Sequence, residues 1–355
     1  MEIKVVIIAG GRGKRFWPVS RQSTPKQILT LFGDKPLIGL TIQRVLPLVT
    51  TDNIYISTGA DLQEKIMEIS HEVTNYITEP LPKDTAAAIG LSAVKIMKDN
   101  KEDAIMIVLP SDHYIENQDA FLDTIKTGIE FAKKNMLVTI GVKPNFPATG
   151  YGYIRAGDEL KGEGIKVWKV EEFFEKPDIR TAEEFIQKGY LWNSGMFIWK
   201  CSTILNEIKK NLPGHYDGLM RIKEGFDTEN EFAIIEDVFN TLDKISIDYG
   251  VMEKSEKVAV VEGTFDWDDV GSWLSIERHF PKDEQGNISK GRFFGLESNN
   301  NIVIGEDKLV STIGINNMII IDTKDALLIV PKERAQDVKK LVEKLRESSD
   351  YRNLT

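Results

Sequence analysis

Through the N-terminal part of the chain, short continuous apolar runs alternate with apolar positions at helical spacing. Runs such as Ile3–Ala9, which contains one Lys, and Ala104–Leu109 predict parallel strands that are buried on both faces of a sheet. Apolar residues three and four apart predict helices between the strands, including Asp84–Met97 and Asp61–Ser70, with Asp61 as the expected N-cap. Strands alternating with helices favour an α/β fold in which a parallel sheet is covered on both faces.

The pattern changes after Asp283, where short alternating runs replace the longer ones and are separated by Gly, Asn and Asp. Such alternation predicts half-exposed strands, and Ala335–Arg346 has the spacing of a closing amphipathic helix. A chain of 355 residues is also longer than one hydrophobic core usually accommodates. We therefore expect a large domain over residues 1–283 and a small C-terminal β-rich domain with a terminal helix over residues 284–355.

Composition and charge restrict the partners and the compartment. Hydrophobic residues make up 41% and charged residues 28%, as in ordinary globular proteins, and the formal net charge is −10. Because no dense Lys/Arg stripe is present, neither nucleic acid nor an anionic membrane is an expected partner. The single cysteine, Cys201, excludes internal disulfides, and no uncharged apolar window reaches the length of a membrane span. These features predict a cytoplasmic protein.

A glycine-rich loop, Gly10–Arg15, follows the first predicted strand. Its three glycines allow the backbone to approach a phosphate closely, and three cations, Arg12 and Arg15 among them, bring positive charge. A dinucleotide-binding loop would need a third glycine where Phe16 stands. A Walker loop would need glycine in place of Ile8 and Ser or Thr in place of Arg15. A purely structural glycine turn is the remaining alternative, and it does not explain the cations.

A longer pattern around this loop resembles the signature of the sugar-1-phosphate nucleotidyltransferases. It runs from Ala9 through Ser20 and continues with Thr24-Pro25-Lys26-Gln27. The Trp-Pro and Pro-Lys-Gln versions found here are typical of mannose-1-phosphate guanylyltransferases. Further segments resemble motifs of that family in the same order: Leu109–His113, Phe174–Pro177, Trp192–Phe197, Ser246–Glu253 and Trp267–Trp273.

The resemblance implies a Rossmann-like, doubly wound mixed sheet of the nucleotide-diphospho-sugar transferase fold, followed by a small β-rich module. A short left-handed β-helix is one form that this module could take, although no clean six-residue repeat is visible. The implied reaction transfers GMP from GTP to α-D-mannose 1-phosphate, with Mg²⁺ as cofactor and a homodimer as the assembly. Two alternatives stay open: another hexose-1-phosphate nucleotidyltransferase of this fold, and a non-catalytic paralogue that binds a GDP-sugar and regulates a partner.

This reaction joins two polyanions and therefore calls for cations more than for a general base. A sugar phosphate carries about −1.5 to −2 charge near pH 7, so the attacking oxygen is already ionised. The resemblance assigns Arg15 and Lys26 to the triphosphate and Lys176 to the sugar phosphate, and these are the expected catalytic residues. The expected nucleotide-binding residues lie in or near the matching segments: Ala9, Gly10, Gly11, Gly13, Glu79, Thr85, Ala86, Pro110 and Ser111.

Two aspartates from distant segments are the expected metal ligands. Asp112 follows a predicted buried strand, where ligands of open α/β sheets collect, and Asp269 lies in a Trp- and Gly-rich turn. Mg²⁺ is commonly held by one or two carboxylates together with substrate phosphates. The family pattern favours Asp269 over its neighbours Asp266 and Asp268, and the role of His113 beside Asp112 stays open.

The choice of base and sugar is expected to depend on a few polar residues. Glu79 is the hypothetical guanine reader, because a carboxylate can accept both donors of the guanine edge; an exposed turn residue is the alternative. For the sugar, the resemblance implies Gly150, Glu175 and Asn193, with the glycine leaving room for the ring. The family's Asn-Thr-Ala-Pro-Ala segment begins here with Asp84, which would repel a nucleotide unless it caps the helix.

Overall fold

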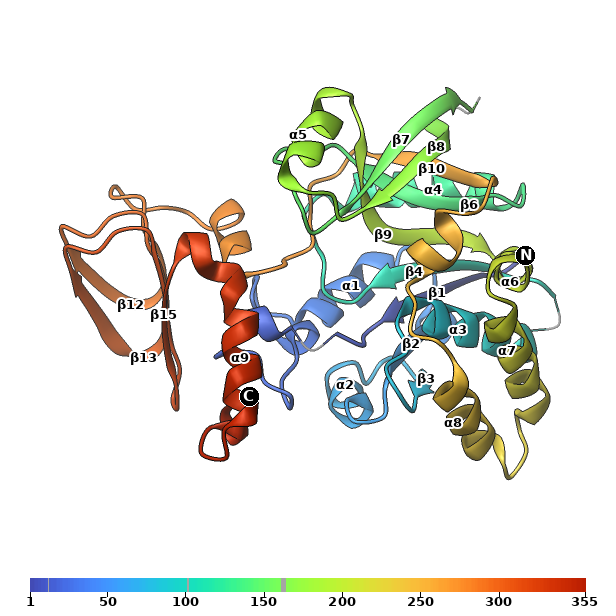
Figure 1. Cartoon of the computed structure of the whole chain (residues 1–355), viewed down its shortest axis with the longest axis horizontal. Coiled ribbons are helices and arrows are strands. Elements are labelled where there is room, and N and C mark those ends of the chain that lie inside the picture. Colours follow the sequence, from blue (N-terminus) through green and yellow to red (C-terminus); the bar gives the residue numbers. More distant parts are fainter. Residues whose placement is uncertain (12, 101, 161–163) are drawn as a thin grey trace. The chain divides into compact units, whose positions relative to one another are not determined.

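The computed structural model describes residues 1–11, 13–100, 102–160 and 164–355, so Arg12 of the glycine loop lies outside the described residues (Figure 1). The chain forms two compact units. The first unit consists of Met1–Gly10, Gly39–Ser111 and Ile115–Trp267. The second unit consists of Gly11–Ile38, Asp112–Tyr114 and Asp268–Thr355.

A nine-stranded mixed sheet forms the centre of the first unit. Its strands lie in the order β3 (Asn75–Glu79), β2 (Ile54–Gly59), β1 (Ile3–Ile8), β4 (Ile105–Pro110), β9 (Leu191–Lys200), β6 (Leu137–Val142), β10 (Val258–Gly263), β8 (Val167–Glu175) and β7 (Gly152–Glu159). The strands β1 to β4 are parallel, whereas β9 runs antiparallel to its neighbours β4 and β6. β10 is parallel to β6 and antiparallel to β8, which is antiparallel to β7. The expected mixed sheet is confirmed.

Helices cover both faces of this sheet (Figure 1). They are α1 (Leu37–Val45), α2 (Gln63–Ile69), α3 (Thr85–Asp99), α4 (Gln118–Ala132), α5 (Ile179–Gln187), α6 (Cys201–Asn211), α7 (Pro213–Gly225) and α8 (Glu231–Thr241). Phe197 and Trp199 of β9 belong to the core that α3, α6, α7 and α8 share. The residue between them, Ile198, points to the other face, where its side chain lies against Gly128 of α4. Burial on both faces explains why a central strand such as β4 is a continuous apolar run.

The order of the strands reverses at β1. β2 and β3 lie on one side of β1 and β4 lies on the other, so the carboxyl ends of β1 and β4 form a topological switch point. The register places Ile8 beside Pro110, and the Ser111 N–H donates to the Ile8 carbonyl at 3.1 Å. Ligands of open α/β sheets bind at such a point. The segments that follow these two strands are the glycine loop and Asp112.

The second unit contains a four-stranded sheet of β12 (Ile288–Leu296), β13 (Ile302–Ile313), β14 (Met318–Asp322) and β15 (Leu327–Pro331), in that order. The first three strands are parallel, and β15 is antiparallel to β14. The Asn301 amide donates to Asn287 Oδ1 at 3.0 Å, and Asn301 Oδ1 accepts from the Met318 N–H at 2.9 Å. These linked positions are 14 and 17 residues apart, so parallel turns of the chain are stacked without a six-residue period. The β-rich C-terminal part is confirmed.

Shorter elements complete both units. The second unit also has the helix α9 (Val338–Glu347) and the turns η1 (Lys14–Phe16), η2 (Lys26–Ile28), η5 (Trp273–Arg278), η6 (Lys332–Asp337) and η7 (Arg352–Leu354). The first unit has η3 (Thr51–Asn53) and the π-helical turn η4 (Asp248–Met252). The strands β5 (Tyr114–Ile115) and β11 (Trp267–Asp268) lie where the chain passes from one unit to the other. Over the part of the chain that the structure describes, every helix is too short or too polar for a membrane crossing.

Candidate active site

One close backbone approach shapes the glycine loop of the second unit. Gly13 has a φ of +60°, and a Cβ atom built on it would lie 2.3 Å from the Cβ of Lys26. A side chain at position 13 would therefore clash with Lys26 and would also have to adopt a left-handed backbone conformation. The Ser20 hydroxyl donates to the Gly13 carbonyl at 2.7 Å, which fixes the turn. Arg15, in η1, is exposed.

Lys26 is a buried cation that links the two expected metal ligands. Its side chain is 8% exposed, its Nζ lies 2.8 Å from Asp112 Oδ2, and the same Nζ donates to the Asp269 backbone carbonyl at 2.6 Å. Removing an ammonium group from water is costly unless such partners replace the lost hydration. The structure thus brings Lys26, Asp112 and Asp269 together around one ammonium group.

The carboxylate groups of Asp112 and Asp269 suit a hard divalent cation. Burial favours the protonated form of Asp112, but the positive charges of Lys26 and His113 outweigh it and lower the pKa of this carboxyl below its usual value. Asp112 is therefore ionised at neutral pH and could serve as an oxygen ligand. Within the described ranges, no cluster of three or more His, Cys, Asp or Glu side chains could hold a metal ion without help. A metal held here would need substrate oxygens as well, which is the usual manner of Mg²⁺ binding.

Asp268, the neighbour of Asp269, is engaged in a different way. Its buried carboxylate accepts from Arg278 Nη2 at 2.8 Å and from the Val270 N–H at 2.7 Å, and it is paired with His279 Nε2 at 2.8 Å. Burial opposes ionisation, yet the hydrogen bonds from His279 and Arg278 hold the pKa of Asp268 far below its usual value. Because these oxygens are already used within the second unit, Asp268 is poorly suited to hold a metal ion.

The expected base-reading carboxylate, Glu79, is buried at the end of β3 in the first unit. Only 8% of the residue is exposed, and its Oε1 accepts from Ser57 Oγ at 3.0 Å. Glu79 is therefore not an exposed turn residue. Burial raises the pKa of Glu79 to about 7, with Ser57 opposing the rise and Asp84 adding to it. Ala9 contacts the same end of β2, because its N–H donates to the Ser57 carbonyl at 2.8 Å and its carbonyl accepts from Thr58 Oγ1 at 3.1 Å.

Asp84 caps the helix α3. Its Oδ1 accepts from the Thr85 N–H at 2.9 Å, and its φ of +71° places it outside the helix. Capping gives this carboxylate a structural role. The Thr85 hydroxyl accepts from the Ile247 N–H at 2.9 Å, and the Ala86 N–H donates to the Ile245 carbonyl at 3.2 Å. The segment before η4 thus holds the start of α3 in place.

The remaining expected nucleotide-binding residues lie around the ends of β1 and β4. Unlike Gly13, Gly10 and Gly11 have no atom within 4 Å of where a Cβ would stand, so their backbone is open to a neighbour. Pro110 is half-buried at the end of β4. Ser111 is buried, and its carbonyl accepts from Thr41 Oγ1 at 3.4 Å.

The expected sugar-binding residues of the first unit meet at β7, β8 and β9. Glu175 ends β8 and forms an ion pair with Lys176. A Cβ atom built on Gly152 would lie 2.4 Å from Glu175 Oε2 and 3.3 Å from the Cβ of Asn193, so these two side chains flank the same glycine. Gly150 is exposed and has open space around it. The structure therefore brings Glu175, Lys176 and Asn193 together, with Gly150 two residues before the flanked glycine.

Asp248 in η4, to which the sequence assigned no role, joins this group. Asn193 Nδ2 donates to Asp248 Oδ1 at 2.9 Å, and Asn193 Oδ1 accepts from Thr139 Oγ1 at 2.8 Å, which fixes the orientation of the amide. Burial and the nearby carboxylate of Glu175 raise the pKa of Asp248 to about 7, against the opposing effects of Asn193 and Lys176. The signal in the sequence was the Ser246–Glu253 motif, in which Asp248 is the polar residue that ends up buried.

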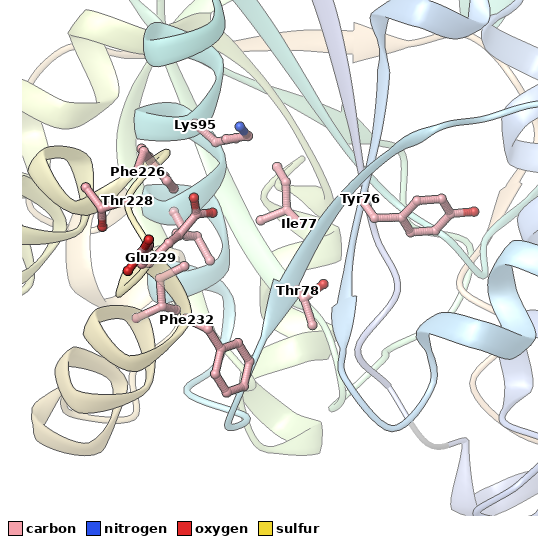
Figure 2. A pocket seen from close by; sticks show the side chains of 11 residues that line it. Tyr76, Ile77, Thr78, Lys95, Phe226, Thr228, Glu229 and Phe232 are labelled. Atoms are coloured by element: carbon pink, nitrogen blue, oxygen red, sulfur yellow. The ribbon is translucent and has the colours of Figure 1, made fainter.

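A separate cavity of about 400 Å³ opens beside β3, the edge strand of the sheet (Figure 2). Figure 2 shows Ile77 and Lys95 at this cavity together with Phe226 and Phe232. The Lys95 ammonium lies 5.3 Å from the centre of the Phe226 ring, so this cation is already engaged. The expected site residues are all described, and none of them lines this cavity. It is therefore not the candidate active site.

Comparisons with known proteins agree with the motifs. The nucleotidyl transferase family model matches residues 4–286, and the MannoseP isomerase/GMP-like beta-helix domain model matches residues 291–345. The mannose-1-phosphate guanylyltransferase of Klebsiella pneumoniae is 39% identical over 354 residues, which cover 98% of this chain and 75% of that protein. The Escherichia coli protein of the same name is 38% identical over 348 residues, covering 97% and 74%. A solved structure described as a mannose-1-phosphate geranyltransferase from Thermus thermophilus has a TM-score of 0.88 at 36% identity and covers 98% of this chain and 100% of that chain.

Proposed function

Because the chain belongs to the nucleotidyltransferase family, and within it to the mannose-1-phosphate guanylyltransferases, we propose that it converts GTP and α-D-mannose 1-phosphate into GDP-mannose and pyrophosphate. The observation that carries this proposal is the ammonium group of Lys26, which holds Asp112 and Asp269 together beside the glycine loop. Cations and carboxylates at that place suit phosphoryl chemistry at a triphosphate.

The reaction places few demands on acid–base catalysis. The sugar phosphate is already ionised, so its oxygen can attack the α-phosphorus of GTP and expel pyrophosphate without a general base. The barrier then depends on holding two polyanions in line and on neutralising the added charge. Arg15 and Lys26 would hold the triphosphate, and Lys176 would hold the sugar phosphate. A Mg²⁺ ion held by Asp112 and Asp269 would supply further charge neutralisation when it is bound.

Recognition of guanine is proposed to depend on Glu79. An ionised carboxylate can accept from N1–H and N2–H₂ of guanine side by side, and adenine and uracil do not offer this pair of donors. Burial of Glu79 supports the role, because a carboxylate shielded from water discriminates more strongly than an exposed one. Its pKa of about 7 means that base recognition should improve as the carboxyl ionises around neutral pH.

Recognition of the sugar is proposed to depend on Glu175 and Asn193, with Gly150 leaving space for the ring. The fixed amide of Asn193 and the carboxylate of Glu175 flank one glycine, so together they could bind adjacent hydroxyl groups. The ammonium group of Lys176 pairs with Glu175 and therefore lies beside a side chain proposed to bind the hydroxyl groups.

The proposal can be tested by a pyrophosphate-release assay. Four nucleoside triphosphates would be combined with three hexose 1-phosphates, each with and without Mg²⁺. We expect GTP with mannose 1-phosphate to be the preferred pair and turnover to require the metal. A preference for another pair would favour a different hexose-1-phosphate nucleotidyltransferase. Binding of GDP-mannose without any turnover would favour a regulatory paralogue.

The assembly is proposed to be a homodimer formed through the C-terminal sheet. Four apolar side chains of β13 and β15 are more than half exposed and line one hollow of about 660 Å³: Leu309, Ile313, Leu327 and Ile329. Apolar side chains gathered on one sheet face in this way commonly mark an interaction surface. Light scattering coupled to gel filtration should give twice the chain mass for the wild type and the single chain mass for Ile313→Asp. A wild-type protein that elutes as a monomer at high concentration would contradict this assembly.

The domain boundary and the cellular compartment are proposed from a turn after Asp283 and from the single cysteine. We propose that the catalytic domain spans residues 1–283 and that the β-rich domain spans residues 284–355. The N–H groups of Gln285 and Asn287 donate to Asp283 Oδ1 at 3.0 and 2.7 Å, so a tight turn follows Asp283. We place the protein in the cytoplasm, since its one cysteine, Cys201, is a buried free thiol.

A further inference from the structure

The loop between Gly13 and Lys26 is fastened to the C-terminal part of the second unit through Trp17. The Trp17 indole N–H donates to the Leu354 carbonyl at 2.7 Å, and the residue is only 7% exposed. On its backbone side, the Trp17 carbonyl accepts from the Trp273 indole at 3.1 Å. One residue of the loop therefore makes two hydrogen bonds with residues that follow it by more than 250 positions.

Further contacts fasten the loop on both sides of Trp17. Lys14 Nζ lies 3.2 Å from Glu343 Oε1 of α9, and α9 packs against η1. Arg21 Nη2 lies 2.9 Å from Asp325 Oδ1 in the β14–β15 turn, and the Arg21 side chain is only 13% exposed. The Arg21 Cζ atom also lies over the Trp17 ring, 5.4 Å from the ring centre. The loop is thus held at three separate points by residues of the β-rich module and its terminal helix.

These contacts matter because the loop has little regular structure of its own. Between Gly13 and Lys26 it contains the three-residue turn η1, and it must nevertheless present Arg15 and the buried Lys26 in fixed positions. Cations that bind a transferring phosphate are most effective when they are already in place, and a misplacement of about 1 Å can cost about 10²-fold in rate. Its own hydrogen bonds are local, such as Phe16 N–H to the Gly13 carbonyl and Ser20 Oγ to the Gly13 carbonyl, so its position depends on what it is packed against.

We propose that Trp17 and Arg21, together with their partners in the C-terminal module, are positioning residues for the triphosphate of the proposed reaction. They act through the loop, which they hold so that Arg15 and Lys26 meet the phosphates. The C-terminal module is then a working part of the GTP site in addition to any role in assembly. This inference rests on the proposed function for its substrate, and it predicts an effect on GTP that is not shared by mannose 1-phosphate.

The test compares Trp17→Phe, Asp325→Asn and Glu343→Gln with the control Lys340→Gln in the full chain. Trp17→Phe keeps an aromatic ring and removes the indole N–H, and Asp325→Asn removes the charge that pairs with Arg21. Lys340 lies on the same helix as Glu343 but pairs with Asp337 at 2.8 Å. We expect an increase of about tenfold in KM for GTP with Trp17→Phe and a smaller increase with Asp325→Asn and with Glu343→Gln. The control should keep both KM values.

A purely structural role would give a different pattern. It would lower the thermal midpoint and the apparent kcat through loss of folded protein, and it would leave the KM for GTP unchanged. If KM for GTP stays within about twofold of wild type in both Trp17→Phe and Asp325→Asn, the inference is overturned. Should Trp17→Phe fail to fold, Asp325→Asn decides alone. If the wild type shows no turnover, the proposed function fails instead, and equilibrium binding of GTP with Mg²⁺ to the same variants tests the loop.

Discussion

Asp268 and Asp269 are adjacent in the chain, but changing each to asparagine is predicted to have different effects. The change at Asp268 should lower the stability of the fold, and the change at Asp269 should weaken metal binding. Asp268 is buried and bonded to Arg278, His279 and the Val270 N–H. Asp269 is half-buried and contributes its backbone carbonyl to Lys26. The substitution removes one negative charge and preserves the size of the side chain in both cases, so each variant is the control for the other.

The expected loss of stability follows from the partners of Asp268. Breaking a buried pair by neutralising one member costs about 3–5 kcal/mol, because the remaining charge is left without compensation. The Arg278 side chain is 34% exposed and can regain water, which places the expected cost for Asp268→Asn near about 3 kcal/mol. That corresponds to a fall of roughly 4 °C in the thermal midpoint of a chain of 355 residues. Asp269→Asn should cost about 1 kcal/mol or less.

Two measurements separate the residues. Thermal unfolding followed by tryptophan fluorescence reports stability, and the Mg²⁺ concentration giving half-maximal pyrophosphate release reports metal binding. Asp269→Asn should raise the required Mg²⁺ concentration about tenfold or more, whereas folded Asp268→Asn should keep the wild-type requirement. The reasoning is refuted if Asp268→Asn unfolds at the wild-type temperature, or if Asp269→Asn keeps the wild-type response to Mg²⁺.

Three further outcomes are expected. Gly13→Ala should lower kcat/KM for GTP by about 10²-fold, since its Cβ would displace Lys26; wild-type kinetics would exclude the close approach as a requirement. Because burial raises the pKa of Glu79 to about 7, the folded state binds the carboxyl proton of Glu79 more tightly than the unfolded chain does. The contribution of Glu79 to the free energy of unfolding therefore falls as pH rises from about 4.5 to 7. Unfolding measured across that range should show Glu79→Gln gaining stability over wild type with pH, and a constant difference would contradict it. Asp248→Asn should raise KM for mannose 1-phosphate about tenfold and leave KM for GTP unchanged, because it disturbs the partner of the Asn193 amide; equal changes in both constants would count against a role at the sugar.

Much of the fold could be predicted because buried strands are visible in the sequence as apolar runs. Apart from Lys4 in β1, the strands β1 and β4 are apolar, since helices cover both faces, and they lie where apolar runs predicted them. The ends of a helix are less clearly indicated by the sequence. Asp61 was expected to cap α2, but that prediction was wrong, because the helix begins at Gln63 with Leu62 as its N-cap. An aspartate before a helical pattern indicates that a helix begins nearby, but it does not fix the first residue of the helix to within one position.

The stacked turns of the C-terminal sheet could not be recognised by period. Asn287 and Asn301 are linked across 14 residues, and Asn301 and Met318 across 17. Unequal turns give no repeat that a fixed spacing would reveal. Asp248 escaped notice for a different reason: its burial, and the amide that faces it from β9, come from segments about 55 residues apart. Only tertiary structure brings such partners together.

The compact units divide the proposed ligands by chemical task. The residues proposed for the triphosphate and the metal, Arg15, Lys26, Asp112 and Asp269, belong to one unit. The residues proposed for the base and the sugar, Glu79, Glu175 and Asn193, belong to the other, together with Lys176 for the sugar phosphate. For protein engineering, this separation suggests where randomised libraries should be directed. A search for enzymes that accept a new base or a new hexose can vary the surroundings of Glu79 or Asn193 while the phosphate-handling segments are left as they are. Specificity and reactivity would then be open to independent selection.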